Sequence, residues 1–145
     1  MTDIRFSLFN RGQNPVGDDM HARFLEACEQ ARLANTLGFD TLMKGSHYSA
    51  YPLLDFQQVP FMARIMAEAP DMRHCAGIVL LPLHKPLDVA ETFANIDVMS
   101  GGKLIFGVGI GYREVEFQAF GTTTKDAAKR FEENLEAVKR LWTEE

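Results

Sequence analysis

Residues 74–108, HCAGIVLLPLHKPLDVAETFANIDVMSGGKLIFGV, decide the fold of this chain. The stretch opens with a short apolar run over 74–81 and closes with a second one over 103–108, both typical of buried strands. Between them Pro86 suits the first turn of a helix, because proline lacks the N–H that this position leaves unpaired. Gly101-Gly102 is expected to end that helix. A strand, a helix and a strand in this order predict a parallel βαβ unit. The apolar face of its helix is predicted to carry Val89, Ala90, Phe93, Ile96 and Met99.

The same alternation extends to both sides of this unit. Upstream, residues 4–9 are predicted as a strand and residues 39–43 as another, with a helix between them that Asp18 or Asp19 caps. A long polar and aromatic loop over residues 44–56 leads into a helix near 57–69. Apolar stripes at helical spacing mark the first helix (Met20, Phe24, Ala27, Cys28, Ala31, Ala34) and the last (Ala128, Phe131, Leu135, Val138, Trp142).

Four strand–helix units therefore follow one another in a single domain, residues 1–145. Parallel strands of this kind close in two ways, as a doubly wound sheet or as part of an eight-stranded barrel. A complete barrel takes about 250 residues, so this chain supplies roughly half of one.

Composition excludes several classes of protein. With 46% hydrophobic and 24% charged residues the chain is globular, and its net charge of −5 argues against a nucleic-acid partner. No run of about 18 apolar residues predicts a membrane span, and Met1 to Arg5 do not begin a signal peptide. Cys28 and Cys75 show no CxxC spacing, which favours two free thiols in a reducing cytoplasm.

Several separated motifs resemble the bacterial-luciferase-like family of flavin-dependent monooxygenases. They are GIVLLPLHKP (77–86), AE (90–91), IDVMSGGK (96–103), FGVGIGYR (106–113), EF (116–117) and FG (120–121), preceded by LGFD (37–40) and GSHY (45–48). Their agreement in order makes the resemblance specific where any one motif alone would be weak.

The resemblance implies a TIM (β/α)8 barrel, of which this chain holds the first four βα units, the N-terminal half. It further implies an enzyme that uses reduced FMN, or the deazaflavin F420 in one branch, with O2 and a small organic substrate. A separate flavin reductase and a second copy of the chain are the expected partners. Family members often have a non-proline cis peptide in the third strand, which by position is Gly77-Ile78 here.

Barrel enzymes carry their sites on the carboxyl ends of the strands. On this basis the resemblance indicates His47 as the catalytic residue, a hydrogen-bonding partner of the flavin or an acid/base group near neutral pH. The predicted cofactor-binding residues are Asn10, Ser46, Gly77, Ile78, Leu80, Gly109, Gly111 and Tyr112. His47 and the 109–112 loop should lie at the same end of the sheet, since both follow parallel strands.

Two departures from the family pattern affect this interpretation. Many relatives carry a Glu-His pair after the second strand, where this chain has Ser46-His47, which puts an acid-assisted role of that loop in doubt. The arginine that usually follows the double glycine is replaced by Lys103 here. This residue lies at the N-terminal end of the fourth strand, so the change is expected to affect stability more than chemistry.

Each candidate also has a structural explanation. His47 is equally well explained as a loop histidine that meets solvent, and Tyr48, Tyr51 and Phe56 either wall a substrate pocket or pack the loop. Gly107-x-Gly109-x-Gly111 lets a flavin or phosphate approach the backbone, but Tyr112 stands where a dinucleotide fingerprint needs its third glycine.

Other residues favour structural roles. Glu114 and Glu116 are expected to hold the loop before the last helix, with Phe117 and Phe120 buried. The remaining histidines have no spacing suited to a shared metal, and Met62 and Met66 favour core or subunit contact.

One alternative function remains open from the sequence: a non-catalytic half-barrel or truncated fragment that self-associates and binds flavin weakly or not at all.

Overall fold

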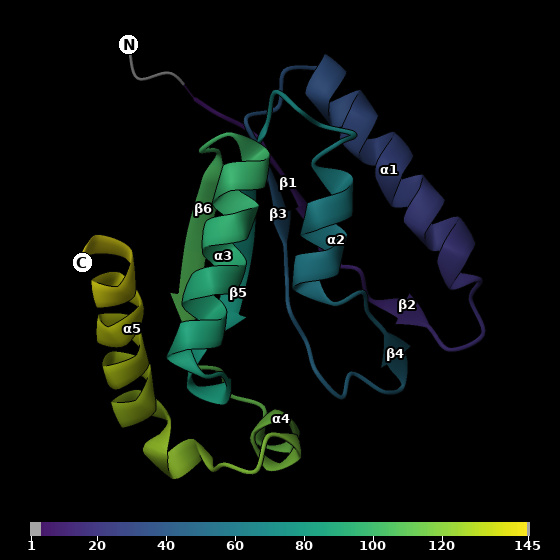
Figure 1. Cartoon of the computed structure of the whole chain (residues 1–145). Coiled ribbons are helices and arrows are strands. Elements are labelled where there is room, and N and C mark those ends of the chain that lie inside the picture. Colours follow the sequence, from purple (N-terminus) through teal and green to yellow (C-terminus); the bar gives the residue numbers. More distant parts are fainter. Residues whose placement is uncertain (1–3, 145) are drawn as a thin grey trace.

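The structure is a computed structural model that describes residues 4–144. Within this range four strands form one parallel sheet in the order β1-β3-β5-β6 (Figure 1). They are β1 (Ser7–Asn10), β3 (Thr41–Lys44), β5 (Arg73–Leu80) and β6 (Leu104–Gly109). Two short segments, β2 (Asn14–Pro15) and β4 (Leu53–Leu54), pair antiparallel with each other. The expectation about the start of the chain falls partly on residues 1–3, outside the described residues.

Helices follow the strands as the βα alternation predicts. They are α1 (Met20–Thr36), α2 (Gln58–Ile65), α3 (Pro86–Ser100), α4 (Glu114–Ala119) and α5 (Ala127–Thr143), with single 3-10 turns η1 (Leu81–Leu83) and η2 (Thr124–Asp126). Asp19 rather than Asp18 caps α1, where its Oδ1 accepts the backbone N–H groups of His21 and Ala22 at 2.9 and 3.2 Å. Gly101 ends α3 in the left-handed region that favours glycine, with a φ of 69°.

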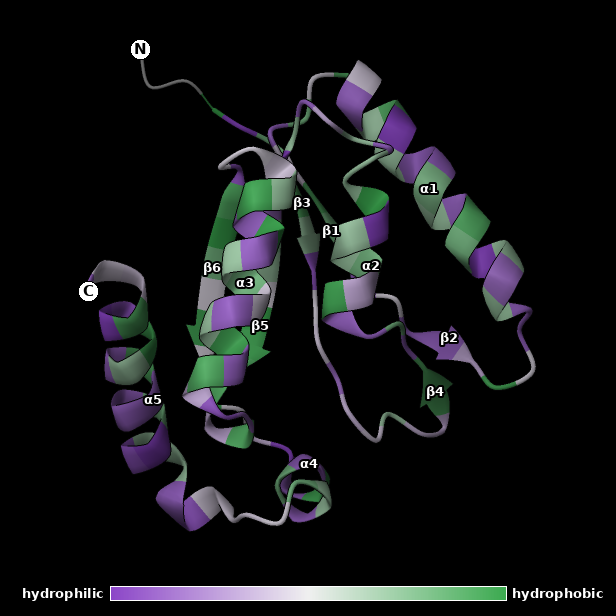
Figure 2. Cartoon of the chain, viewed as in Figure 1, coloured by the Kyte–Doolittle hydropathy of each residue, from purple (hydrophilic) through white to green (hydrophobic). Residues whose placement is uncertain are grey.

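The helices pack on one face of the sheet. Two apolar clusters form the core: α1 and α2 pack over β1 and β3 through residues such as Ala31 and Leu42, and α2, α3 and α5 pack over β5 and β6. Figure 2 shows how hydrophobic residues concentrate on β5 and β6. A doubly wound sheet carries helices on both faces, so the one-sided packing does not support that alternative. Residues 4–144 do not form a closed barrel.

The opposite face of the sheet, here called the open face, has no helix over it within the described range. Its side chains include Phe9, Met43, Ile78 and Ile105, and Phe9 and Ile78 keep 49% and 39% of their surface exposed. Leu8 and Val108, from the same strands as Phe9 and Gly107, pack under the helices on the other face.

Some boundaries and burials differ from the sequence-based predictions. β1 starts at Ser7 rather than residue 4, because its pairing with β3 begins at Ser7 opposite Thr41. α2 ends at Ile65 instead of near residue 69, in a tight turn where the N–H of Glu68 donates to Ile65. Met99 and Phe120, both predicted to be buried, are 58% and 39% exposed, while Met62 and Met66 lie in the core as expected. Both cysteines are free and buried.

Candidate functional site at the carboxyl ends of the strands

The loops after β3, β5 and β6 meet at one end of the sheet, as the parallel topology predicts. A pocket of about 200 Å³, here called the sheet-face pocket, opens there, and both His47 and Tyr112 line it. The predicted placement of His47 and the 109–112 loop at the same end is therefore confirmed. The other side chains and backbone segments around this pocket belong to Phe9, Gly45, Ser46, Gly77, Ile78, Leu80, Gly111 and Glu116.

The Gly77–Ile78 peptide on the floor of this pocket is cis, as the family resemblance predicts. Ala76 and Val79 both face the helices, and the register between β5 and β6 shifts between these two residues. As a result Gly77 and Ile78 both belong to the open face.

Glycines on the open face make room for large neighbours. A Cβ on Gly77 would lie 2.6 Å from the Met43 side chain, and one on Gly109 would lie 2.1 Å from Cδ1 of Ile78. The space above Gly109 is thus filled by Ile78. The open face is a mostly apolar platform, with polar groups gathered at its carboxyl end.

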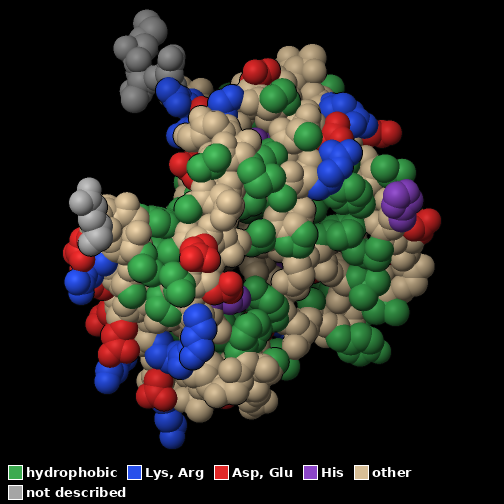
Figure 3. Space-filling view, in the orientation of Figure 1, with side chains coloured by type: hydrophobic (Ala, Val, Ile, Leu, Met, Phe, Trp, Pro, Cys, Tyr) green, Lys and Arg blue, Asp and Glu red, His purple; other side chains and the backbone are tan. Residues whose placement is uncertain are grey.

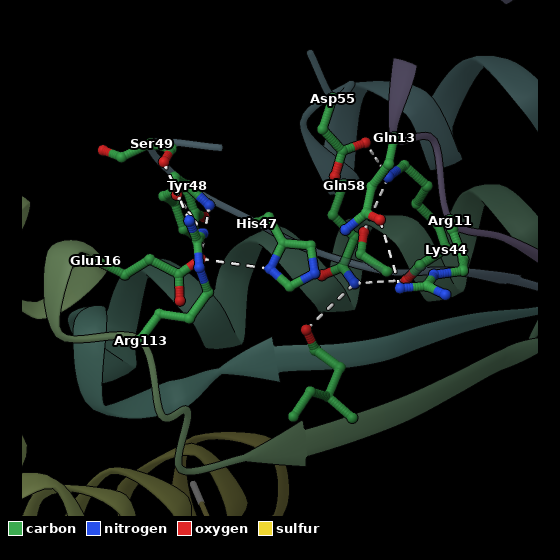
Figure 4. A network of polar contacts seen from close by, with 12 residues as sticks. Arg11, Gln13, Lys44, His47, Tyr48, Ser49, Asp55, Gln58, Arg113 and Glu116 are labelled. Atoms are coloured by element: carbon green, nitrogen blue, oxygen red, sulfur yellow. Dashed lines mark hydrogen bonds and ion pairs between the residues drawn. The ribbon is translucent and has the colours of Figure 1, made fainter. Parts of the chain in front are cut away.

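His47 projects toward a carboxylate that comes from α4 (Figure 4). Its Nδ1 lies 3.5 Å from Oε1 of Glu116, which is 1% exposed. The same oxygen accepts the backbone N–H of Tyr48 at 2.9 Å and Nη1 of Arg113 at 2.8 Å. Arg113 also donates to the carbonyls of Tyr48 and Ser49. Glu116 thereby ties the loop after β3 to α4, whereas the sequence indicated a role in the loop before the last helix.

A second polar cluster lies on the helix-covered side of the sheet. Oη of Tyr48 and Nε2 of His84 are 3.3 Å apart, and Phe120 packs edge-on against both rings. Burial raises the pKa of Tyr48 and lowers the pKa of His84. The two residues line a pocket of about 300 Å³ beside α2 and α3, and Figure 3 shows a hollow among hydrophobic side chains on that side of the molecule.

Sequence reasoning missed a buried ion pair at the end of β3. Nζ of Lys44 lies 2.7 Å from Oδ1 of Asp55 and donates to the carbonyl of Gly45, with the Phe61 ring 5.6 Å away. Both charged side chains are almost fully buried, and burial raises the pKa of Asp55 despite the nearby ammonium group. Gln58 completes the cluster by donating to the carbonyl of Lys44 at 2.8 Å. No pattern in the sequence marks Lys44, because it looks like an ordinary loop lysine.

The structure brings together most of the predicted site residues. Ser46, His47, Gly77, Ile78, Leu80, Gly111 and Tyr112 all line the sheet-face pocket. Asn10 lies elsewhere: it lines a polar pocket beside α1, and its buried Oδ1 has no hydrogen-bond donor within residues 4–144. Gly109 lies under Ile78. Of the three loop aromatics, Tyr48 lines the pocket beside α2 and α3, Tyr51 is exposed, and Phe56 packs against Phe24 and Phe61.

Two further structural findings concern metals and membranes. Within the described residues no three His, Cys, Asp or Glu side chains are grouped so that they could hold a metal ion. None of the helices in the same range combines the length and the apolar character that crossing a membrane requires.

Comparison with known proteins now decides the family. A family model described as luciferase-like monooxygenase matches residues 4–145. The chain belongs to the luciferase-like monooxygenase family. This membership agrees with the open apolar platform and with the cis peptide at its centre.

Curated relatives and solved structures from this family resemble the chain along nearly its whole length. The 4-hydroxyprotoasukamycin monooxygenase of Streptomyces nodosus subsp. asukaensis is 28% identical over 144 residues, which are 99% of this chain and 38% of that protein. The oxygenase component of the flavin-dependent trigonelline monooxygenase of Acinetobacter baylyi is 26% identical and covers 96% of this chain and 39% of its own.

Among solved structures, monooxygenase RslO1 from Streptomyces bottropensis superposes with a TM-score of 0.87 at 31% identity, over 98% of this chain and 44% of that one. Two more distant structures share the fold. The oxygenating constituent of 3,6-diketocamphane monooxygenase from Pseudomonas putida, solved with FMN, has a TM-score of 0.88 at 19% identity, over 98% of this chain and 40% of its own. The F420-dependent tetrahydromethanopterin reductase of Methanopyrus kandleri has a TM-score of 0.66 at 16% identity, over 91% and 39%.

The chain spans about two-fifths of the length of the curated relatives named here. The similarity of sequence and fold therefore concerns that share of each relative.

Proposed function

We propose that this chain is the N-terminal half of a (β/α)8 flavin-dependent monooxygenase that acts on a small organic substrate. The observation that carries the proposal is the sheet-face pocket, in which an apolar platform lies beside a single histidine, His47. Family membership supports the reaction class, and monooxygenase relatives are similar to the chain over almost its full length.

The residues around the pocket fit a flavin ring system. A flat, largely apolar ring requires a flat apolar surface with few polar groups, and Phe9, Gly45 and Ile78 provide one on the open face. His47 supplies a ring nitrogen at the edge of this surface. When bound, reduced flavin supplies the electrons that activate O2.

The described side chains then have distinct roles. The residues that would hold the flavin ring are Gly77, Ile78 and Leu80 on the sheet and Ser46, Gly111 and Tyr112 at its carboxyl end, all of which line the pocket. His47 is placed to hold or move a proton at the ring edge or on the substrate, since imidazole exchanges protons near neutral pH. Asn10 and Gly109 do not line the pocket and have no direct role in this proposal.

FMN is the cofactor we favour over F420. The trigonelline enzyme is described as flavin-dependent and the camphane enzyme was solved with FMN, whereas the F420-dependent relative has the lowest TM-score of the three structures. The trigonelline protein is an oxygenase component. By analogy we propose that a separate flavin reductase supplies reduced FMN here.

Titration of the chain with reduced FMN and reduced F420 under anaerobic conditions tests this proposal. We expect FMN to bind weakly, to bind more tightly than F420, and to be lost on Ile78→Asp, which places a charge on the apolar platform. The exposed control His21→Gln should retain binding. Absence of binding by both cofactors at millimolar concentration, or binding that Ile78→Asp leaves unchanged, would argue that this face is not the flavin site.

A further inference from the structure

The Nδ1 atom of His47 is buried and makes no hydrogen bond to the described residues. A buried ring nitrogen without a partner is costly, and most such groups in native proteins find one. Oε1 of Glu116, at 3.5 Å, is the acceptor that faces it (Figure 4). Hydrogen bonds of catalytic groups are often long in ligand-free structures and shorten when the site is filled. A movement of a few tenths of an ångström closes this one, since side-chain donor–acceptor distances of about 3 Å are usual.

We propose that Glu116 is the positioning residue for His47. Its carboxylate accepts the Nδ1–H of the neutral imidazole and so keeps the proton on Nδ1, which leaves Nε2 with its lone pair free to accept a proton in the pocket. The tautomer of a neutral histidine is set by the hydrogen bonds that its two ring nitrogens make, so an acceptor at Nδ1 leaves Nε2 unprotonated. This inference rests on the proposed role of His47 in the sheet-face pocket.

Glu116 is held firmly enough for this task. Its Oε1 already accepts the N–H of Tyr48 and Nη1 of Arg113, and its neighbour Phe117 is fully buried under the same loop. Nη1 of Arg113 lies 2.8 Å from the same oxygen and so balances the charge of a carboxylate that is 1% exposed. A positioning carboxylate needs these properties, because a mobile one would not select a tautomer.

The arrangement also accounts for the missing acid beside His47. Position 46 is Ser46, so the loop after β3 offers no carboxylate of its own at the preceding residue. Glu116 brings one to the same histidine from α4. The contacts of Glu116 with residues 47–49 and with Arg113 therefore stabilise that loop and also orient the imidazole ring of His47.

Long-range ¹H–¹⁵N NMR of the whole chain at a pH of about 8, where imidazole is neutral, reads the tautomer of His47 directly. The spectrum of His47→Gln identifies its signals. We expect Nδ1–H to exceed Nε2–H by about tenfold, the effect of one charge-assisted hydrogen bond. In Glu116→Gln, where the acceptor is neutral, that ratio should fall by about three- to tenfold. Glu114→Gln is the matched control, because Glu114 lies exposed on the same helix and bonds Thr124.

A wild-type spectrum dominated by Nε2–H overturns the proposal without any variant, even if Glu116→Gln does not fold. A ratio unchanged in a folded Glu116→Gln also overturns it, and so does an equal fall in the Glu114→Gln control. Flavin titration is a separate readout: wild-type chain that shows the Nδ1–H tautomer but binds no flavin would contradict the proposed function while the pairing with Glu116 stands.

Discussion

Lys44 ends β3 with its side chain on the helix-covered face of the sheet, where only Asp55 matches its charge within the described residues. Removing one partner of a buried ion pair leaves the other as an uncompensated buried charge, which costs about 3–5 kcal/mol. We therefore expect Lys44→Met to lower the free energy of unfolding by that amount, measured by urea denaturation. Replacing both partners, as Lys44→Met/Asp55→Leu, should recover most of the loss, because an apolar pair suits the same space.

Arg140→Ala is the control at this scale, since its pair with Glu144 lies on the surface and should be worth less than about 1 kcal/mol. If Lys44→Met costs no more than this control, the buried pair contributes little to stability. If Lys44→Met is too unstable to measure, the double variant still tests the reasoning, because it should fold.

At the residue scale, the sequence predicted the position of a side chain correctly where that position depends only on the strand that the residue follows. His47 and Tyr112 follow parallel strands, and the topology brings them into one pocket. It could not place Asn10, because strand alternation turns that side chain to the helix side, with Leu8, and the register was unknown beforehand. It also could not link Glu116 to His47. That contact joins the loop after β3 to the short helix α4, and no periodic pattern encodes their approach.

At the scale of elements, Gly107 of β6 runs close to the backbone of β5. A Cβ on Gly107 would lie 2.5 Å from the carbonyl oxygen of Ala76, which is backbone and cannot move aside. Gly107→Ala should therefore push β6 away from β5 and destabilise the chain by about 1–3 kcal/mol, the usual cost of overpacking. Thermal or urea unfolding measures this loss.

Gly45→Ala is the matched control, because a Cβ there would make only ordinary contacts of 3.5 Å with the Phe9 ring. We expect a change within about 1 kcal/mol, with a small gain possible because alanine restricts the unfolded chain. Equal destabilisation by the two substitutions would mean that the close approach of the two strands is not what Gly107 serves.

The βα alternation could be predicted because strands and helices differ in apolar period, and α1 and α3 bury nearly the faces that their sequences indicate. The β2–β4 pair and α4 could not be predicted from the sequence. β2 and β4 are two residues each and carry no alternation, and α4 is too short to show a stripe. Met99 was misplaced for a related reason: it lies at the last turn of α3, where the helix has passed beyond the sheet-facing core.

At the scale of the whole molecule, the described residues leave two kinds of surface that favour association. β1 and β6 are the outer strands of the sheet, with backbone groups available for pairing. The open face adds apolar side chains between them, including the half-exposed Phe9 and Ile78. Exposed apolar area of this extent on a soluble chain usually marks an interaction surface. A second copy that pairs edge to edge would cover both the strand edges and the open face. A two-fold arrangement of this kind is closed, so it stops at a dimer.

We therefore expect the chain alone to sediment as a dimer or a larger species at micromolar concentration. Ile105→Lys places a charge on the open face and should shift the chain toward monomer, because an unpaired charge is disfavoured in an apolar interface. Val98→Lys, at a 79% exposed position on α3, tests whether the chain associates through its helices instead. If Val98→Lys dissociates the chain and Ile105→Lys does not, the interface lies on the helices and not on the open face. A wild-type chain that remains monomeric and binds FMN tightly would contradict self-association altogether, since the open face would then be stable and competent without a partner.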